Sequence, residues 1–149
     1  MHRLNDERAI REWIREHKIE VPWDNHIRVY KAVASPREDG RYHSWYNPRK
    51  CYQIGSEVVA RRLTVNDFRR CGEGLHVSTY NWSKKFGRER LGEYSVLSCI
   101  VCLDDRIVIP KEWMGNKKKW TCEKIRVGRL VVEGEVMKAS KHAFIRRCY

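Results

Sequence analysis

The chain has 149 residues and a formal net charge of +12 at neutral pH, with 42% apolar and 34% charged side chains. A chain of this length fits one domain with its own core, which we expect to span residues 1–149. No apolar run approaches the roughly 20 residues of a membrane span, and the first residues lack the apolar stretch of a secretory signal. We therefore expect no membrane partner and a cytoplasmic location.

The hydrophobic pattern divides the chain into three segments. Residues 1–22 predict a helix, residues 26–137 a sheet core with one further helix, and residues 138–149 a basic C-terminal tail. The first helix is expected to begin at an N-cap Asn5 and to bury Trp13 on its apolar face.

Alternating apolar residues predict the strands of the core. We expect strands at residues 27–34, 57–63, 75–78, 94–102, 106–110 and 124–137, the last with a bulge near Gly128. Thr79 is expected to cap a helix over about residues 80–90, and residues 35–50 and 111–121 are predicted to be loops. Helices followed mostly by strands indicate an α+β fold with a mixed or largely antiparallel sheet, arranged as two packed sheets with flanking helices.

A glycine turn at residues 71–74 leads into the strand that carries the candidate site. Because side chains alternate along a strand, His76 and Ser78 should face one cavity while Leu75 and Val77 are buried behind them. The alternative for His76 is a hydrogen-bonded strand histidine without a ligand.

The positive charge predicts a phosphate-bearing partner, either a small molecule or a nucleic acid. The first 20 residues carry five basic and five acidic side chains, so the excess lies further along the chain. Two exposed clusters are candidate nucleic-acid contacts: Lys84, Lys85, Arg88 and Arg90 on the second helix, and Lys117, Lys118 and Lys119 in the second loop. The alternative is a basic surface that only solvates the protein.

Aromatic rings in the first predicted loop give a second candidate contact. Tyr42 and Trp45 lie among basic residues there, and such rings can stack on a base while the cations hold its phosphate. The equally open alternative is that these rings cap the edge of the core.

Six cysteines raise the question of a metal or a disulfide. Cys99 and Cys102 have CxxC spacing, but residues three apart on a strand point to opposite faces. We therefore predict reduced, metal-free cysteines and no metal site.

The order of these motifs resembles the ADP-ribosyltransferase-like fold over residues 26–136. Arg28, Tyr30 and Lys31 look like its first NAD-holding strand, although Lys31 stands where toxin-type members have arginine. Gly72, Gly74, His76, Ser78 and Thr79, with Trp82 and Phe86 behind them, look like its nicotinamide-lining strand and helix. The resemblance implies a late catalytic acid, matched here by Glu123, Glu133 or Glu135.

Three segments resemble small uncharacterised domains of bacteriophage and giant-virus proteins more closely. They are residues 29–32, 71–77 and 124–136. This resemblance implies a viral origin and, for a phage protein, action in the cytoplasm of the infected host.

These patterns leave three functions open. The first is a phage-type binding protein for a nucleotide-like polyanion, acting against host defence signalling and needing no cofactor. Its ligand-binding residues would be Arg28, Tyr30, Lys31, Tyr42, Trp45, His76, Ser78, Thr79, Glu123 and Glu135. The second is a nucleic-acid-binding protein, and the third is a mono-ADP-ribosyltransferase that uses NAD.

Overall fold

The computed structural model describes residues 6–34, 41–44, 49–66, 72–114 and 118–139. Two helices lie within these ranges, α1 (Glu7–Glu16) and α2 (Tyr80–Arg90). The strands are β1 (His26–Ala34), β2 (Tyr42–His43), β3 (Cys51–Tyr52), β4 (Glu57–Val59), β5 (Leu75–Ser78), β6 (Tyr94–Cys102), β7 (Ile107–Val108), β8 (Lys111–Met114), β9 (Lys118–Thr121), β10 (Lys124–Val127) and β11 (Arg129–Ala139).

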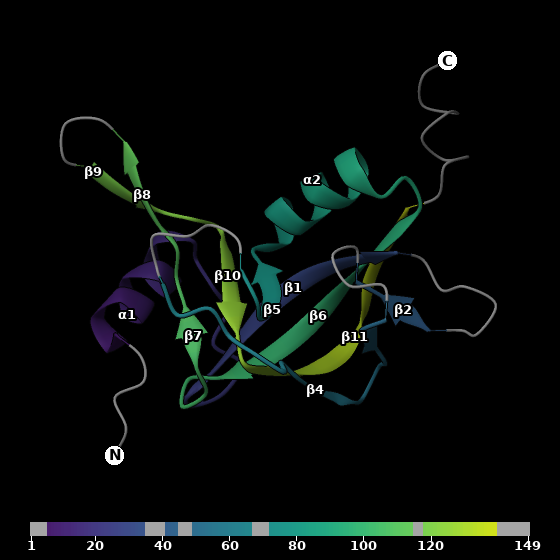
Figure 1. Cartoon of the computed structure of the whole chain (residues 1–149), viewed down its shortest axis with the longest axis horizontal. Coiled ribbons are helices and arrows are strands. Elements are labelled where there is room, and N and C mark those ends of the chain that lie inside the picture. The colour runs from purple at the N-terminus through teal and green to yellow at the C-terminus, as the bar shows by residue number, and fades with distance from the viewer. Residues whose placement is uncertain (1–5, 35–40, 45–48, 67–71, 115–117, 140–149) are drawn as a thin grey trace.

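Every strand pair in the described ranges is antiparallel, which confirms the predicted α+β class with a largely antiparallel sheet. Nine strands form one sheet in the order β4-β11-β6-β1-β5-β10-β7, with β2 bonded to β1 and β3 bonded to β2. This sheet curves strongly, and the β8–β9 hairpin projects from it (Figure 1). The core is therefore built on one curved sheet rather than on the two packed sheets that the sequence predicted.

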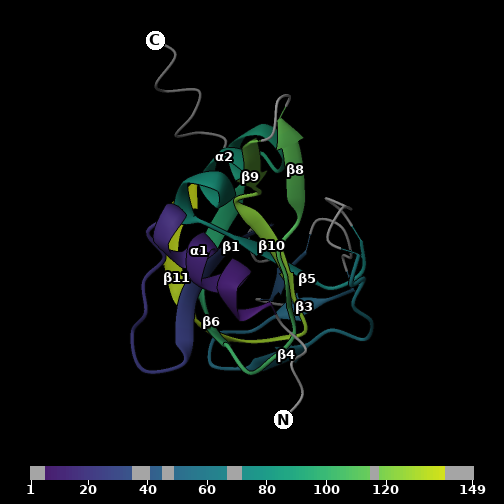
Figure 2. The same cartoon turned by 90° about the vertical axis from the view of Figure 1, so that its left-hand side faces the viewer.

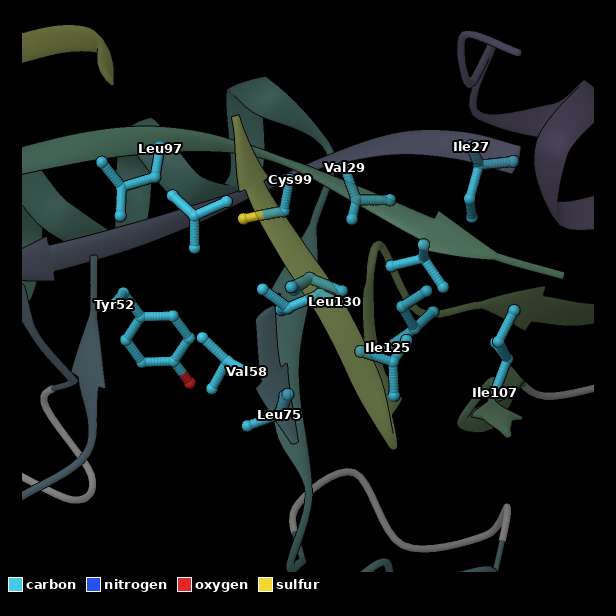
Figure 3. Close-up of a cluster of buried hydrophobic side chains, with 14 of the residues drawn as sticks. Ile27, Val29, Tyr52, Val58, Leu75, Leu97, Cys99, Ile107, Ile125 and Leu130 are labelled. Atoms are coloured by element: carbon cyan, nitrogen blue, oxygen red, sulfur yellow. The ribbon is translucent and has the colours of Figure 1, made fainter. Parts of the chain in front are cut away.

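Apolar side chains from most of these strands converge on the concave side of the sheet (Figure 3). Alternate residues along each strand point to the same face, so one face of β1 contributes Ile27, Val29 and Val33 to this core. The neighbouring strand β6 contributes Leu97 and Cys99 from its own inner face. The curvature thus lets a single sheet enclose its own core.

The first helix closes one end of that core, as Figure 2 shows. Trp13 is fully buried, and its indole Nε1 donates a hydrogen bond to the Cys122 carbonyl at 2.9 Å. The N-cap is Asp6, whose side chain accepts a hydrogen bond from the Ala9 amide, so the predicted start at Asn5 is wrong by one residue. Neither α1 nor α2 is long and apolar enough to span a membrane.

The second helix lies across the outer face of the sheet (Figure 1). Its predicted cap is confirmed, because the Thr79 hydroxyl accepts a hydrogen bond from the Trp82 amide at 3.2 Å. Gly87 faces the sheet, where an added methyl group would overlap the ring of Tyr94. The glycine therefore allows the helix to approach β6 closely.

Several predicted segments differ from the structure. The first expected loop, residues 35–50, contains β2 and is followed directly by β3, and the second contains the β8–β9 hairpin. The strand expected over residues 57–63 is the shorter β4, which ends at Val59. The long strand expected over residues 124–137 is two strands, because the chain turns at Gly128, and the bulges lie within β11 instead. Short strands such as β3 form because their residues pair with distant parts of the chain and bury a ring such as Tyr52, which local patterns do not reveal.

Candidate functional site

The central strand β1 has different partners along its two edges. One edge pairs with β6 from end to end, whereas the other pairs with β5 at Tyr30 and with β2 at Ala34. Lys31 lies between these two pairings. Beside it is a cavity of about 590 Å³, which we call the basic cavity, lined by Lys31, Ser44, Lys50, Tyr52, Ala60, Arg61, Arg62, Gly72, Glu73, Gly74, Leu75 and His76.

Lys31 is a lysine in an apolar row. Its side chain lies between those of Val29 and Val33 on the core face of β1, and Lys31 is only 6% exposed. Its ammonium donates a hydrogen bond to the His76 carbonyl at 2.8 Å and lies 4.9 Å from the centroid of the Tyr52 ring. No described carboxylate pairs with it. Burial lowers the pKa of Lys31 to about 8. Cys99 opposes this shift, and the charge of Lys124 adds to it.

The glycine turn forms one wall of the basic cavity. The Thr64 amide donates a hydrogen bond to the Glu73 carbonyl at 2.8 Å, and the Glu73 amide donates to the Thr64 hydroxyl at 2.9 Å. A side chain at Gly72 would collide with Thr64, and Gly74 has φ of +139°, which side-chain-bearing residues rarely adopt. The two glycines therefore let the turn pack tightly against residues 63–64 and place His76 at the cavity.

The predicted alternation of β5 is confirmed for its apolar half, since Leu75 and Val77 are buried in the core. His76 and Ser78 both line a small crevice of about 20 Å³ beneath α2, but only His76 also lines the basic cavity. Ser78 is buried and lies 2.5 Å from the Ser83 hydroxyl of α2. Ser78 therefore fastens the helix to β5, and the proposal that both residues face one ligand cavity is only partly correct.

His76 is held in place as a neutral ring. Its Nε2 donates a hydrogen bond to the Gly72 carbonyl at 2.7 Å. Burial lowers the pKa of His76 to about 4, an effect that this hydrogen bond opposes and that the charges of Lys124, Lys31 and Arg126 increase. At neutral pH the imidazole therefore adds shape and a dipole to the site, while the surrounding cations supply its charge.

Two buried cations of β10 stand close to this ring. Arg126 is fully buried, pairs with His76 across the sheet, and donates hydrogen bonds to the carbonyls of Thr64 (3.1 Å) and Asn66 (2.9 Å). Lys124 is also buried, with its ammonium 5.8 Å from the centroid of the Trp82 ring. Neither residue was predicted from the sequence as part of the site. In the sequence, the two cations alternate with the apolar residues Ile125 and Val127. This pattern is equally typical of a strand whose charged side faces solvent, so it does not indicate a buried site.

Further positive charge surrounds the mouth of the basic cavity. Lys50 is fixed by a hydrogen bond from its ammonium to the Val59 carbonyl at 2.6 Å, and Arg61 and Arg62 are exposed. Neither arginine forms an ion pair within the described part of the chain. Glu73 is the one carboxylate among the described lining residues, against four basic side chains. The wall therefore favours an anion electrostatically.

Arg28 and Tyr30 do not line the basic cavity, although Tyr30 lines the crevice beneath α2 together with Lys31. Arg28 forms ion pairs with Glu20 at 2.6 Å and with both carboxylate oxygens of Glu133 at 2.6 and 3.0 Å. The hydrogen bonds to Glu133 and Glu20 raise the pKa of Arg28 above its ordinary value. Tyr30 packs edge-on against Tyr80, with ring centroids 5.3 Å apart. Arg28 therefore belongs to a structural ion cluster.

The remaining predicted ligands are also away from the basic cavity. Tyr42 donates a hydrogen bond to Glu135 at 2.5 Å, and the same carboxylate accepts from Ser95 at 3.0 Å. Burial and then this bond raise the pKa of Tyr42 to about 12. Glu123 is exposed, and Thr79 serves as the helix cap. Trp45 lies outside the described residues.

The predicted basic surface of α2 is present. Lys85, Arg88 and Arg90 are exposed, and the Lys84 ammonium lies 5.5 Å from the centroid of the Tyr80 ring. Of the second cluster, Lys118 and Lys119 belong to β9, whereas Lys117 lies outside the described residues.

Cys99 and Cys102 are separated as their spacing predicts. Cys99 is buried in the core, where burial raises the pKa of its thiol to about 12, and Cys102 is half-buried at the end of β6. The described residues contain no group of three or more His, Cys, Asp or Glu side chains that could hold a metal ion. Whether the whole chain is metal-free stays a prediction.

No protein-family model, curated protein or solved structure matches this chain. The resemblances to the ADP-ribosyltransferase-like fold and to viral domains therefore stay predictions. The candidate site rests on the geometry of the chain itself.

Proposed function

We propose that the protein binds a phosphate-bearing, nucleotide-like small molecule in the basic cavity. The observation that carries this proposal is Lys31, a buried ammonium on the cavity wall with no carboxylate partner among the described residues. Burying a charge in this way is costly unless an opposite charge arrives. A phosphate placed in the cavity would supply that charge.

The other cations of the cavity suit the same ligand. Lys50, Arg61 and Arg62 come from a separate stretch of chain and approach the cavity from its rim. Arginine can bind phosphate oxygens through two parallel hydrogen bonds, and lysine contributes a compact point charge. A cavity of about 590 Å³ is within the range that small-molecule sites occupy. One buried and three peripheral cations therefore fit a ligand with more than one negative charge.

The direct test is isothermal titration calorimetry with pyrophosphate and with ADP. We expect both to bind the wild type. The Lys31→Met variant should bind about 10 to 100 times more weakly, because a hydrogen bond to a charged group contributes about 1.5–3 kcal/mol. Lys85→Met is the matched control, since it removes an exposed lysine of α2 and should leave both affinities unchanged. Equal weakening in the two variants, or no binding to the wild type, would contradict the proposal.

A second candidate function is nucleic-acid binding by α2, favoured by the exposed cations Lys85, Arg88 and Arg90 on one helix. Such a surface binds through several phosphates at once, so its affinity falls steeply with salt. A single-stranded oligonucleotide titrated at about 50 and 200 mM salt distinguishes the two functions, because a small ligand in a cavity should show a much weaker salt dependence.

A further inference from the structure

The Lys31 amine has the surroundings of a nucleophile, in addition to those of an anion ligand. Lysine is almost never fully buried unless it is paired, and a methionine would fill this apolar row without the cost of a buried charge. Lys31 instead lines the basic cavity, and it also lines the separate crevice beneath α2. Its amine is thus buried in protein but adjacent to open space.

The contacts of Lys31 leave its lone pair available. The one hydrogen bond to the His76 carbonyl uses a single N–H, and the Tyr52 ring offers no acceptor that would require a second proton. A neutral amine satisfies the same hydrogen bond and retains its lone pair. Because burial lowers the pKa of Lys31 to about 8, about a tenth of the protein carries a neutral amine at pH 7 while the rest carries the ammonium.

We propose that Lys31 forms an imine with a phosphate-bearing aldehyde or ketone bound in the basic cavity, an inference that rests on the proposed function. The amine nitrogen adds to the carbonyl carbon and gives a carbinolamine. A C=N bond then replaces the C–O bond, and the carbonyl oxygen leaves as water with the two protons of the amine. The step consumes no oxidant or reductant, and water reverses it.

The rim cations give the reaction its selectivity. Arg61 and Arg62 would hold the phosphate and so raise the local concentration of the carbonyl beside Lys31. An aldehyde without a phosphate has no such anchor. An exposed lysine such as Lys85 lacks the phosphate-binding wall.

Trapping with a small phosphorylated aldehyde tests this proposal. The wild type is treated at pH 7.5 with glycolaldehyde phosphate and cyanoborohydride, which reduces the imine to a stable amine, and the labelled lysine is identified by peptide mass spectrometry. We expect at least about tenfold more label on Lys31 than on Lys85, because the basic cavity holds the phosphate and so places the aldehyde beside the Lys31 amine. Glycolaldehyde, which lacks the phosphate, should lose most of this preference.

The imine and the binding site are tested separately, because pyrophosphate binds without a carbonyl group. Lys31→Met removes the amine and should lose the dominant label, whereas the control Lys85→Met should keep both the label on Lys31 and pyrophosphate binding. Label spread evenly over the lysines while pyrophosphate still binds the wild type would overturn the imine and leave the proposed function standing. Absence of pyrophosphate binding to the wild type would overturn both.

Discussion

Arg28 and Lys31 are two cations three residues apart on β1, and they differ in their interaction partners. Arg28 is at the outer face, where two carboxylates bind its guanidinium. Lys31 is at the core face, where it has one backbone carbonyl and an aromatic ring as partners. The first arrangement is complete without a ligand. The second leaves a buried positive charge that an anion would stabilise, and this difference separates a structural cation from a functional one.

The largest expected effect concerns the pH dependence of stability. Since the pKa of Lys31 is about 8 in the folded protein and near 10.5 when unfolded, the unfolded chain holds more protons between these pH values. Stability should therefore rise with pH across this window. Each pH unit corresponds to about 1.4 kcal/mol, so the free energy of unfolding should increase by roughly 3 kcal/mol relative to Lys31→Met, which lacks the titrating group.

Chemical denaturation of the wild type and Lys31→Met at pH 7, 8, 9 and 10 measures this difference. Titrating groups common to both proteins contribute equally to both free energies of unfolding, so they cancel in the difference. A constant difference across the series would mean that Lys31 is charged and satisfied without a ligand, and the contrast with Arg28 would fail.

Removal of Arg28 should change the free energy of unfolding by a smaller amount and leave ligand binding unchanged. Arg28→Met leaves Glu20 and Glu133 without their shared cation, and we expect the free energy of unfolding to fall by about 1 kcal/mol, the upper end for partly exposed ion pairs. Pyrophosphate affinity, followed by calorimetry, should stay at the wild-type value because Arg28 faces away from the basic cavity. A loss of affinity comparable to that of Lys31→Met would assign Arg28 to the binding site.

The exposed rim should contribute less to binding than the buried ammonium does. We expect Arg61→Ala with Arg62→Ala to weaken pyrophosphate binding about 3- to 10-fold at low salt, and by less at 0.5 M salt because exposed charges are screened. Stability should change by less than about 0.5 kcal/mol per substitution, as is usual at exposed positions. Unchanged affinity at low salt would remove the rim from the site.

The smallest effect on the small ligand is expected from α2. A variant with alanine at Lys84, Lys85, Arg88 and Arg90 should bind pyrophosphate as the wild type does and should lose oligonucleotide affinity with a shallower salt dependence. Loss of pyrophosphate binding in this variant would place the anion site on the helix instead of the basic cavity.

Local signals predicted the part of the chain around β5 and α2 well. Thr79 is of a residue type favoured at helix N-caps and stands directly before α2. In β5, the apolar residues Leu75 and Val77 alternate with the polar residues His76 and Ser78. Both features depend on residues close in sequence. The glycine turn before β5 was likewise visible, and the structure uses Gly72 and Gly74 to pack the cavity wall.

The ligand set could not be predicted in the same way. The short strand β3 pairs with β2, which in turn pairs with β1, so Tyr52 reaches Lys31 only through contacts distant in sequence. Arg126 was missed because a cation between apolar residues usually marks a solvent-facing position on a strand. Arg28 was grouped with Lys31 through the resemblance to an NAD-holding strand, although residues three apart on a strand lie on opposite faces.

The partners of β1 also constrain the order of events when the chain folds. One edge of β1 pairs along its full length with β6, whose paired residues lie 60 or more positions further along the chain. In turn, β6 pairs with β11 near the other end of the described chain. Closing loops of this length costs conformational entropy before any contact compensates for it. Proteins dominated by such distant pairings fold in about milliseconds to seconds. During synthesis, β1 therefore emerges long before its partner and has no complete sheet to join until β6 has left the ribosome.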